Sequence, residues 1–255
     1  MKKMLRFALF LLPAAAFTLG CTSAQVAFPS GADKAGFDKS AVKGRGGFSF
    51  FTEKISFGGY SVKLTRGWTS SESSSSFIPF VKDDKSEKEQ KYSFTIKGPD
   101  GFEAQGKCRA YGKAETTGVK IMKLSLTDGG SLVGSLDASF MGSDGKKSDL
   151  ALAGSIEAKT GTLKGNGITF DVKSTSSVEG SKWVRQDITG YYICEGDKAI
   201  AVVDVMSDGA VYIQKGIKKE YIPAVISAAT ALLTYKDLAK DIRQEQENQK
   251  NKKKK

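Results

Sequence analysis

Apolar and polar residues alternate with a period of two through most of the chain, from Phe48 to Gln214. Residues 92–96 read Tyr-Ser-Phe-Thr-Ile and lead into a Gly-Pro-Asp-Gly turn, after which the alternation resumes. This pattern predicts a β-hairpin over residues 91–112. Similar runs follow, separated by glycine-containing turns. Their spacing predicts an all-β domain over residues 48–217, an antiparallel β-sandwich or open barrel of roughly 10–12 strands.

The last third of the chain changes character. Runs at 191–194 and 200–205 are more continuously apolar, which predicts strands buried on both faces. After Tyr221 the apolar residues recur every three or four positions, so one C-terminal amphipathic helix is expected over 218–243, docked on an end or face of the sheet. Its uncharged stretch is shorter than the ~20 residues that a membrane-spanning helix needs. Residues 244–255 are expected to form a disordered, lysine-rich tail.

The N-terminus has the organisation of an export signal over residues 1–20. Three basic residues precede an apolar run at Phe7–Phe17, which is too short to cross a membrane as a helix. The sequence Thr-Leu-Gly-Cys follows at once and ends at Cys21. This arrangement resembles the lipobox of bacterial lipoproteins, in which the cysteine is acylated and becomes the new N-terminus.

The resemblance implies that Cys21 carries acyl chains such as palmitate and anchors the protein stably. Thr22 and Ser23 follow the cysteine, and no aspartate does, which implies sorting to the outer membrane. Whether the protein would face the periplasm or the cell surface stays open. Residues 21–47 are then the lipid anchor and a flexible tether, with a short helix around 33–43 as one option within it. The alternative is ordinary cleavage near residues 22–24, which would give a soluble secreted protein.

The two remaining cysteines, Cys108 and Cys194, lie in a chain that the signal directs to an oxidising compartment. A disulfide between them is therefore expected. The alternative is a pair of buried free thiols that behave as small apolar side chains. Neither their spacing nor the histidine content supports a metal site, and no cofactor is expected.

The absence of histidine excludes catalytic mechanisms that need a Ser-His-Asp or Cys-His arrangement within this chain. No catalytic residue is nominated, and a carboxylate-based hydrolase is retained as a minor alternative. The net charge of +11 is mostly outside the predicted fold: the signal contributes +3 and residues 236–255 contribute +4, which leaves 11 − 3 − 4 = +4. A fold this weakly basic does not indicate a nucleic-acid partner.

One segment interrupts the strand pattern. A serine tract at 70–76 is followed by Phe77, Ile78, Phe80 and Val81, with a proline between the second and third of these. One interpretation is an edge strand that tolerates the proline. The other is a contact loop that touches a ligand, a membrane or a protein.

These observations favour an exported, non-enzymatic envelope lipoprotein whose β domain binds a protein or a small apolar ligand. The architecture is similar to that of lipocalins, but their Gly-x-Trp signature is absent. The alternative is a structural tether in which a cationic tail of Lys252, Lys253, Lys254 and Lys255 contacts the anionic cell wall or lipid. A terminal lysine on a lipid-anchored chain is similar to the small murein-bound lipoprotein, which is joined to peptidoglycan through its last lysine.

Overall fold

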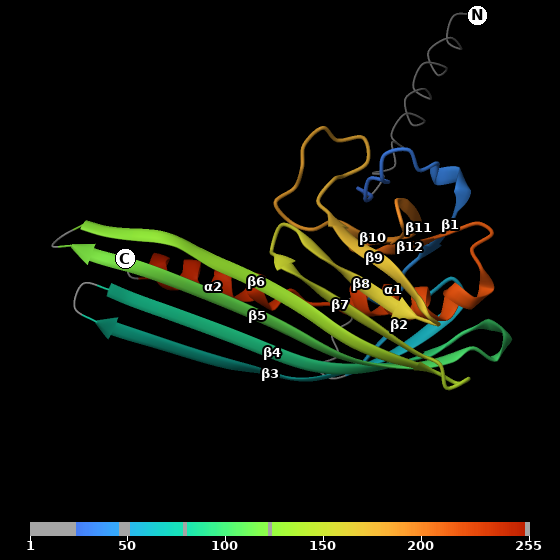
Figure 1. Cartoon of the computed structure of the whole chain (residues 1–255), viewed down its shortest axis with the longest axis horizontal. Helices are drawn as coiled ribbons and strands as arrows, with labels where there is room; N and C mark the ends of the chain where they lie inside the picture. The colour runs from blue at the N-terminus through green and yellow to red at the C-terminus, as the bar shows by residue number, and fades with distance from the viewer. Residues whose placement is uncertain (1–23, 46–51, 79–80, 122–123, 253–255) are drawn as a thin grey trace, which may run out of the picture.

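A single antiparallel sheet contains all the strands of the computed structural model, which describes residues 24–45, 52–78, 81–121 and 124–252. Twelve strands are found in these residues, in the spatial order β1-β12-β11-β10-β9-β8-β7-β6-β5-β4-β3-β2 (Figure 1). Their bounds are β1 Phe37–Ala41, β2 Thr52–Phe57, β3 Tyr60–Ile78, β4 Val81–Lys97, β5 Glu103–Ile121, β6 Leu124–Gly142, β7 Lys147–Ser155, β8 Lys159–Gly165, β9 Ile168–Thr175, β10 Gly190–Glu195, β11 Lys198–Asp204 and β12 Ala210–Gln214.

The two ends of the sheet meet and make a nearly closed barrel. Just after β1, Lys43 exchanges two backbone hydrogen bonds with Ser56 of β2, at 2.9 and 3.0 Å. The predicted all-β antiparallel fold is confirmed, as a barrel rather than a sandwich. The predicted hairpin over 91–112 is confirmed as the β4–β5 connection, where Asp100 and Gly101 take positive φ angles of 54° and 74° in the turn.

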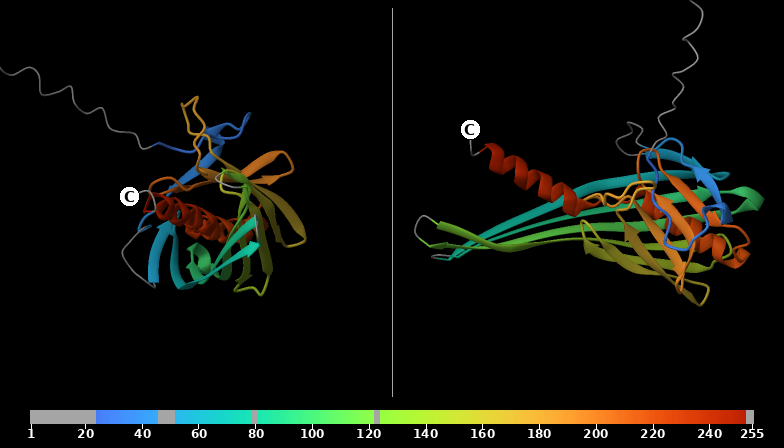
Figure 2. Two further views of the ribbon diagram at one scale, coloured as in Figure 1. Left: turned by 90° about the vertical axis from the view of Figure 1, so that its left-hand side faces the viewer. Right: turned by 90° about the horizontal axis from the view of Figure 1, so that it is seen from above.

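A helix, α1 (Ile222–Thr234), fills the interior of the barrel (Figure 2). Every residue from Ala224 to Thr234 is buried, and the hydroxyls of Thr230 and Thr234 donate to carbonyls of the helix's own preceding turn. The sequence Ile-Pro-Ala-Val-Ile-Ser-Ala-Ala-Thr-Ala-Leu-Leu-Thr carries no charge. A helix that is apolar all round is suited to burial on all sides, not to one face of a sheet.

The helical region continues beyond the predicted end at residue 243. After a break at residues 235–237, a second helix, α2, runs from Leu238 to Lys252. Asp237 accepts a hydrogen bond from the backbone N–H of Ala239 at 3.2 Å and so starts α2 as a capping residue. Residues 244–252, expected in the tail, are helical, and residues 253–255 lie outside the described part of the chain.

Four strands are much longer than the others and form an arm that extends from the barrel (Figures 1 and 2). We define the arm as residues 69–78, 81–90, 110–121 and 124–132. The serine tract lies within it, because each serine of β3 from 70 to 76 pairs with a residue of β4. The first three ranges have at least ten residues at about 3.3 Å each, so the arm is on the order of 30 Å long.

The α2 helix lies against the arm and is seated there by small residues of β5. A Cβ atom at Gly112 would be 2.4 Å from the backbone nitrogen of Ala239, so only glycine permits this approach. Leu238, Ala239 and Ile242 are the buried residues of α2. The remaining turns are polar and face a groove of about 620 Å³ that also contains Ser71 and other serines of β3.

The described N-terminal residues pack onto the outer face of β10–β12. Val26 is buried with Val202 and Tyr212 in a second apolar cluster, and the ring of Phe28 meets Tyr212 edge to face at 5.0 Å. This covering explains why β11 is buried on both faces, as its continuous apolar run predicted. Part of the segment expected to be a tether is thus packed on the barrel. The optional short helix around 33–43 is present only as one 3-10 turn at Lys34–Gly36, and β1 follows it.

Candidate functional site

The predicted disulfide is wrong: Cys108 and Cys194 are both free and buried. Cys108 lies on β5 and belongs to the barrel core, whereas Cys194 lies on β10. Four strands, β6 to β9, separate β5 from β10 in the sheet. At about 4.8 Å per strand the two thiols are far beyond the reach of a disulfide.

The environment of both thiols suppresses their reactivity. Burial raises the pKa of Cys108 to about 12, and burial also raises the pKa of Cys194. The thiolate is the reactive form of cysteine, so both residues are chemically quiet at neutral pH.

The candidate contact residues lie at the end of the arm, where β3 turns into β4. In the backbone register Ile78 pairs with Val81, Val81 pairs with Val119, and Val119 pairs with Leu126. Pro79 and Phe80 lie outside the described residues. The fold therefore brings a second apolar stretch, at the β5–β6 turn, beside the one that the sequence singled out.

The edge-strand interpretation of this segment also describes part of the structure. β2 pairs with β3 only as far as Thr65, and β7 reaches only Val133 of β6. Beyond these points, β3 and β6 have a strand neighbour on one side alone in the described sheet. The arm is consequently a four-stranded ribbon with two edges that present backbone hydrogen-bonding groups.

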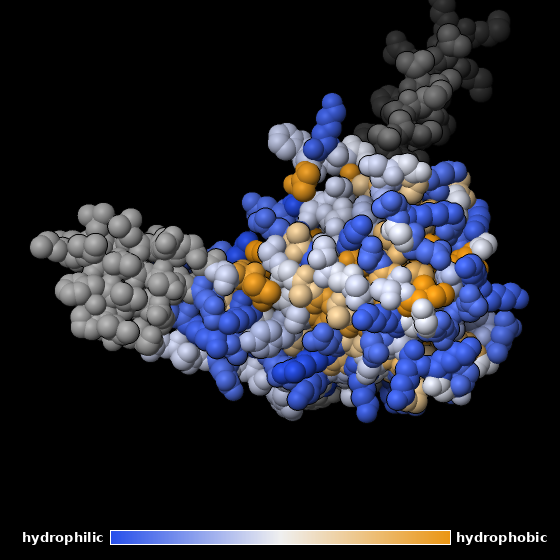
Figure 3. Space-filling model, viewed as in Figure 1, coloured by the Kyte–Doolittle hydropathy of each residue, from blue (hydrophilic) through white to orange (hydrophobic). Residues whose placement is uncertain are grey.

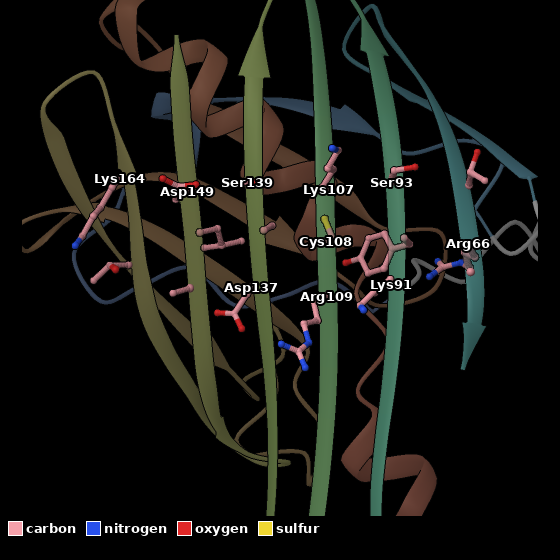
Figure 4. A pocket seen from close by; sticks show the side chains of 17 residues that line it. Arg66, Lys91, Ser93, Lys107, Cys108, Arg109, Asp137, Ser139, Asp149 and Lys164 are labelled. Carbon is pink, nitrogen blue, oxygen red and sulfur yellow. The ribbon is translucent and has the colours of Figure 1, made fainter. Parts of the chain in front are cut away.

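A groove of about 880 Å³ lies on the outer face of the sheet (Figure 4). Two cross-strand rows of side chains form its floor. One row is Lys91, Arg109, Asp137, Ala151 and Thr162, and the other is Thr65, Ser93, Lys107, Ser139, Asp149 and Lys164. Small side chains at the centre of the two rows form the hollow, and charged side chains surround it.

The cations of this groove differ in how they are compensated. Glu89 lies 3.0 Å from Arg109 and 3.3 Å from Lys91, and the hydrogen bond from Arg109 lowers the pKa of its carboxyl group. Lys107 and Lys164 form no ion pair within the described chain. The groove is open, and its charged side chains surround a lining that is largely apolar.

The groove also brings two carboxylates onto neighbouring strands, Asp137 on β6 and Asp149 on β7. Both residues are exposed. A general acid in a carboxylate-pair enzyme needs surroundings that keep its proton at neutral pH, which burial usually supplies. The geometry of this pair therefore gives the hydrolase alternative no support.

Sequence reasoning missed a buried cluster at the break between α1 and α2. The side chain of Lys159 is fully buried, and its Nζ lies 2.8 Å from Asp237 and 2.7 Å from the carbonyl of Ser155. The ammonium group of Lys159 also lies above the ring of Tyr235. Burial is the main reason that the pKa of Tyr235 is raised. The sequence contains a signal for this cluster: with a period of two, Lys159 falls on the same inward face of β8 as Leu163. The cluster thereby links β8 to the first residues of α2 through Asp237.

Comparisons of the chain with protein-family models, with curated proteins and with solved structures found no match. Among the described residues, no group of three or more histidine, cysteine, aspartate or glutamate side chains is placed to hold a metal ion. No helix in the described ranges has both the length and the apolar character needed to cross a membrane.

Proposed function

We propose that this protein is a non-enzymatic, lipid-anchored envelope protein that binds a partner protein through the end of its arm. The observation that carries the proposal is the division of the sheet into a filled barrel and a projecting ribbon. Because α1 occupies the barrel, the core side chains of the described residues pack against this helix and not around a cavity of the lipocalin kind. The surface available for binding is the outside of the sheet and the arm.

The composition of the arm supports a protein partner over a small apolar ligand. Apolar residues gather in the sequence at both hairpin turns, Phe77–Val81 and Val119–Leu126, and the register places these turns at one end of the ribbon. Two neighbouring apolar turns offer an anchor of the kind that protein interfaces use at their centre. The two edges of the ribbon add the option of β-strand addition by the partner.

The positions of the N-terminal segment and the arm on the barrel support this role. The described N-terminal segment packs on the barrel, and the arm extends away from it (Figure 2). With acylation at Cys21, the barrel would stay beside the outer membrane and the turns would reach on the order of 30 Å further. This arrangement suits a protein that contacts a partner at a distance from its anchor.

The proposal is tested by site-specific photocrosslinking in intact cells. A benzoylphenylalanine at Ile78 or at Ile121 should give one and the same crosslinked species, and serine substitutions of Phe77 and Phe80 should abolish it. The matched control is Met141, a half-exposed apolar residue on the barrel side of β6. Equal crosslinking from Met141, or none from either arm position, would overturn the assignment of the arm as the binding surface.

The tether is the second candidate, and the course of α2 favours it. This helix leaves the barrel and runs along the arm, so Lys252 lies at the arm side of the molecule (Figure 1). A lipid anchor and a cationic tail would then act at opposite ends. Deletion of Lys252–Lys255 should reduce co-sedimentation with purified peptidoglycan, and unchanged sedimentation would refute the tether.

A further inference from the structure

Two adjacent apolar side chains are strongly exposed on the barrel. Trp183 is 85% exposed and Val184 is 72% exposed. They belong to the loop between β9 and β10, residues 176–189, which projects from the barrel (Figure 1). In the space-filling view this loop presents hydrophobic and hydrophilic side chains together (Figure 3). A tryptophan and a valine held together in water favour an apolar contact.

The charges around these residues have one sign. Lys182 and Arg185 flank the pair, are exposed, and make no ion pair within the described chain. The two acids of the loop are already compensated: Glu179 lies 2.5 Å from a lysine of the N-terminal segment, and Asp187 lies 2.8 Å from a lysine of α2. The exposed part of the loop is therefore cationic as well as apolar.

The loop is joined directly to the described N-terminal segment. Val26 forms a β-bridge with Val178, and the flanking backbone bonds measure 3.1 and 2.9 Å. The loop and this segment lie on the same side of the barrel in both views (Figures 1 and 2). Four residues separate Cys21 from the buried Val26, and the five steps between the two span at most about 18 Å.

We propose that the 176–189 loop is a membrane-contact element in which Trp183 and Val184 enter the interface of an anionic bilayer while Lys182 and Arg185 bind its headgroups. The proposal rests on the lipid anchor at Cys21, because that anchor holds the loop within reach of the bilayer. Tryptophan is favoured at the membrane interface, and lysine and arginine are attracted to anionic lipid. Contact at a second point fixes the orientation of the barrel, which a single flexible anchor does not.

The experiment uses the two tryptophans of the chain as a matched pair, because Trp68 is as exposed as Trp183, at 84%, but lies at the base of the arm. The full-length protein is reconstituted into vesicles of phosphatidylethanolamine and phosphatidylglycerol that contain brominated acyl chains. The Trp68→Phe variant reports Trp183 alone, and the Trp183→Phe variant reports Trp68 alone. We expect insertion to blue-shift Trp183 emission and the bromine to quench it, while Trp68 emission stays unchanged.

The headgroup contact is tested by Lys182→Gln/Arg185→Gln in the Cys21→Ser background, where the anchor does not mask the contribution of the loop. Binding of the full-length chain to the same vesicles should fall by about 20- to 30-fold, and high salt should remove the difference. Trp183 emission that brominated lipid does not alter would overturn the membrane contact. The mass of the N-terminal peptide reports acylation of Cys21 separately, so failure of the anchor and failure of the loop contact are distinguishable.

Discussion

The buried ion pair at the start of α2 gives the sharpest prediction for stability. In the Lys159→Met variant the side chain keeps its length and loses its charge, and the carboxylate of Asp237 loses its cation at 2.8 Å. Removal of one partner from a buried pair costs about 3–5 kcal/mol. Because Asp237 is 17% exposed and still accepts a bond from Ala239, we expect the lower end of this range, about 3 kcal/mol.

Urea denaturation monitored by circular dichroism measures this loss as a lower midpoint at unchanged slope. For a chain of this size the melting temperature should fall by about 6–12 °C. The matched control is Lys85→Met. Lys85 also pairs with a carboxylate, Glu87 at 2.6 Å, but its side chain is 46% exposed, so solvent screens the pair and we expect the urea midpoint to stay nearly unchanged.

A second variant separates the ion pair from simple packing. Asp237→Asn keeps an oxygen that can cap α2 and removes the charge that Lys159 compensates. In this background Lys159→Met should cost clearly less than it does alone, because no carboxylate is left without its cation. The reasoning is refuted if Lys159→Met costs under about 1 kcal/mol, or if its cost is the same in both backgrounds.

Three further predictions concern other parts of the fold. Gly112→Ala should lower the unfolding free energy measured in urea by about 1–3 kcal/mol, because the new Cβ meets the backbone of α2. The control Gly36→Ala, whose Cβ has nothing within 4 Å, should cost under half of that. Equal costs would contradict the seating of α2 on β5. Peptide mass spectrometry after alkylation in non-reducing denaturant should find Cys108 and Cys194 both alkylated, and neither alkylated in the native protein at pH 7; a linked pair would contradict the structure. Burial raises the pKa of Asp204, so its ionised form is disfavoured in the native state. The unfolding free energy of the wild type relative to Asp204→Asn should therefore decrease as pH rises from about 4 through the raised native pKa, and stay level above it; an increase over this window would refute the argument.

Local patterns predicted the strands well because a half-buried strand leaves its trace in every second residue. The hairpin at 91–112 and the doubly buried β11 follow from residues close in sequence. The barrel could not be separated from a sandwich, because closure depends on pairing near Lys43 and Ser56, and the alternation within a strand does not tell which strands meet. The serine tract has no strand pattern of its own, because its place in β3 is set by the partner strand and not by its own propensity.

The candidate site was less accessible to sequence reasoning for a related reason. The segment Phe77–Val81 could be recognised from the sequence, because its apolar residues are consecutive neighbours between polar stretches. Its neighbour at the β5–β6 turn became relevant only through the register of four strands. The disulfide between Cys108 and Cys194 was inferred from compartment and number, which carry no information about the distance between β5 and β10.

The distribution of apolar contacts separates a rigid base from an adaptable arm. In the barrel the core side chains pack around α1. Close packing of this kind leaves the side chains and the backbone little room to move. Along the arm, α2 buries only its first turns, and its later residues meet polar groups, such as the ion pair of Glu245 with Lys88. Such polar contacts exchange readily with water, so the arm and the end of α2 should open at lower free energy than the barrel. A binding surface on this arm would therefore adapt to its partner while the filled barrel keeps its position relative to the anchor.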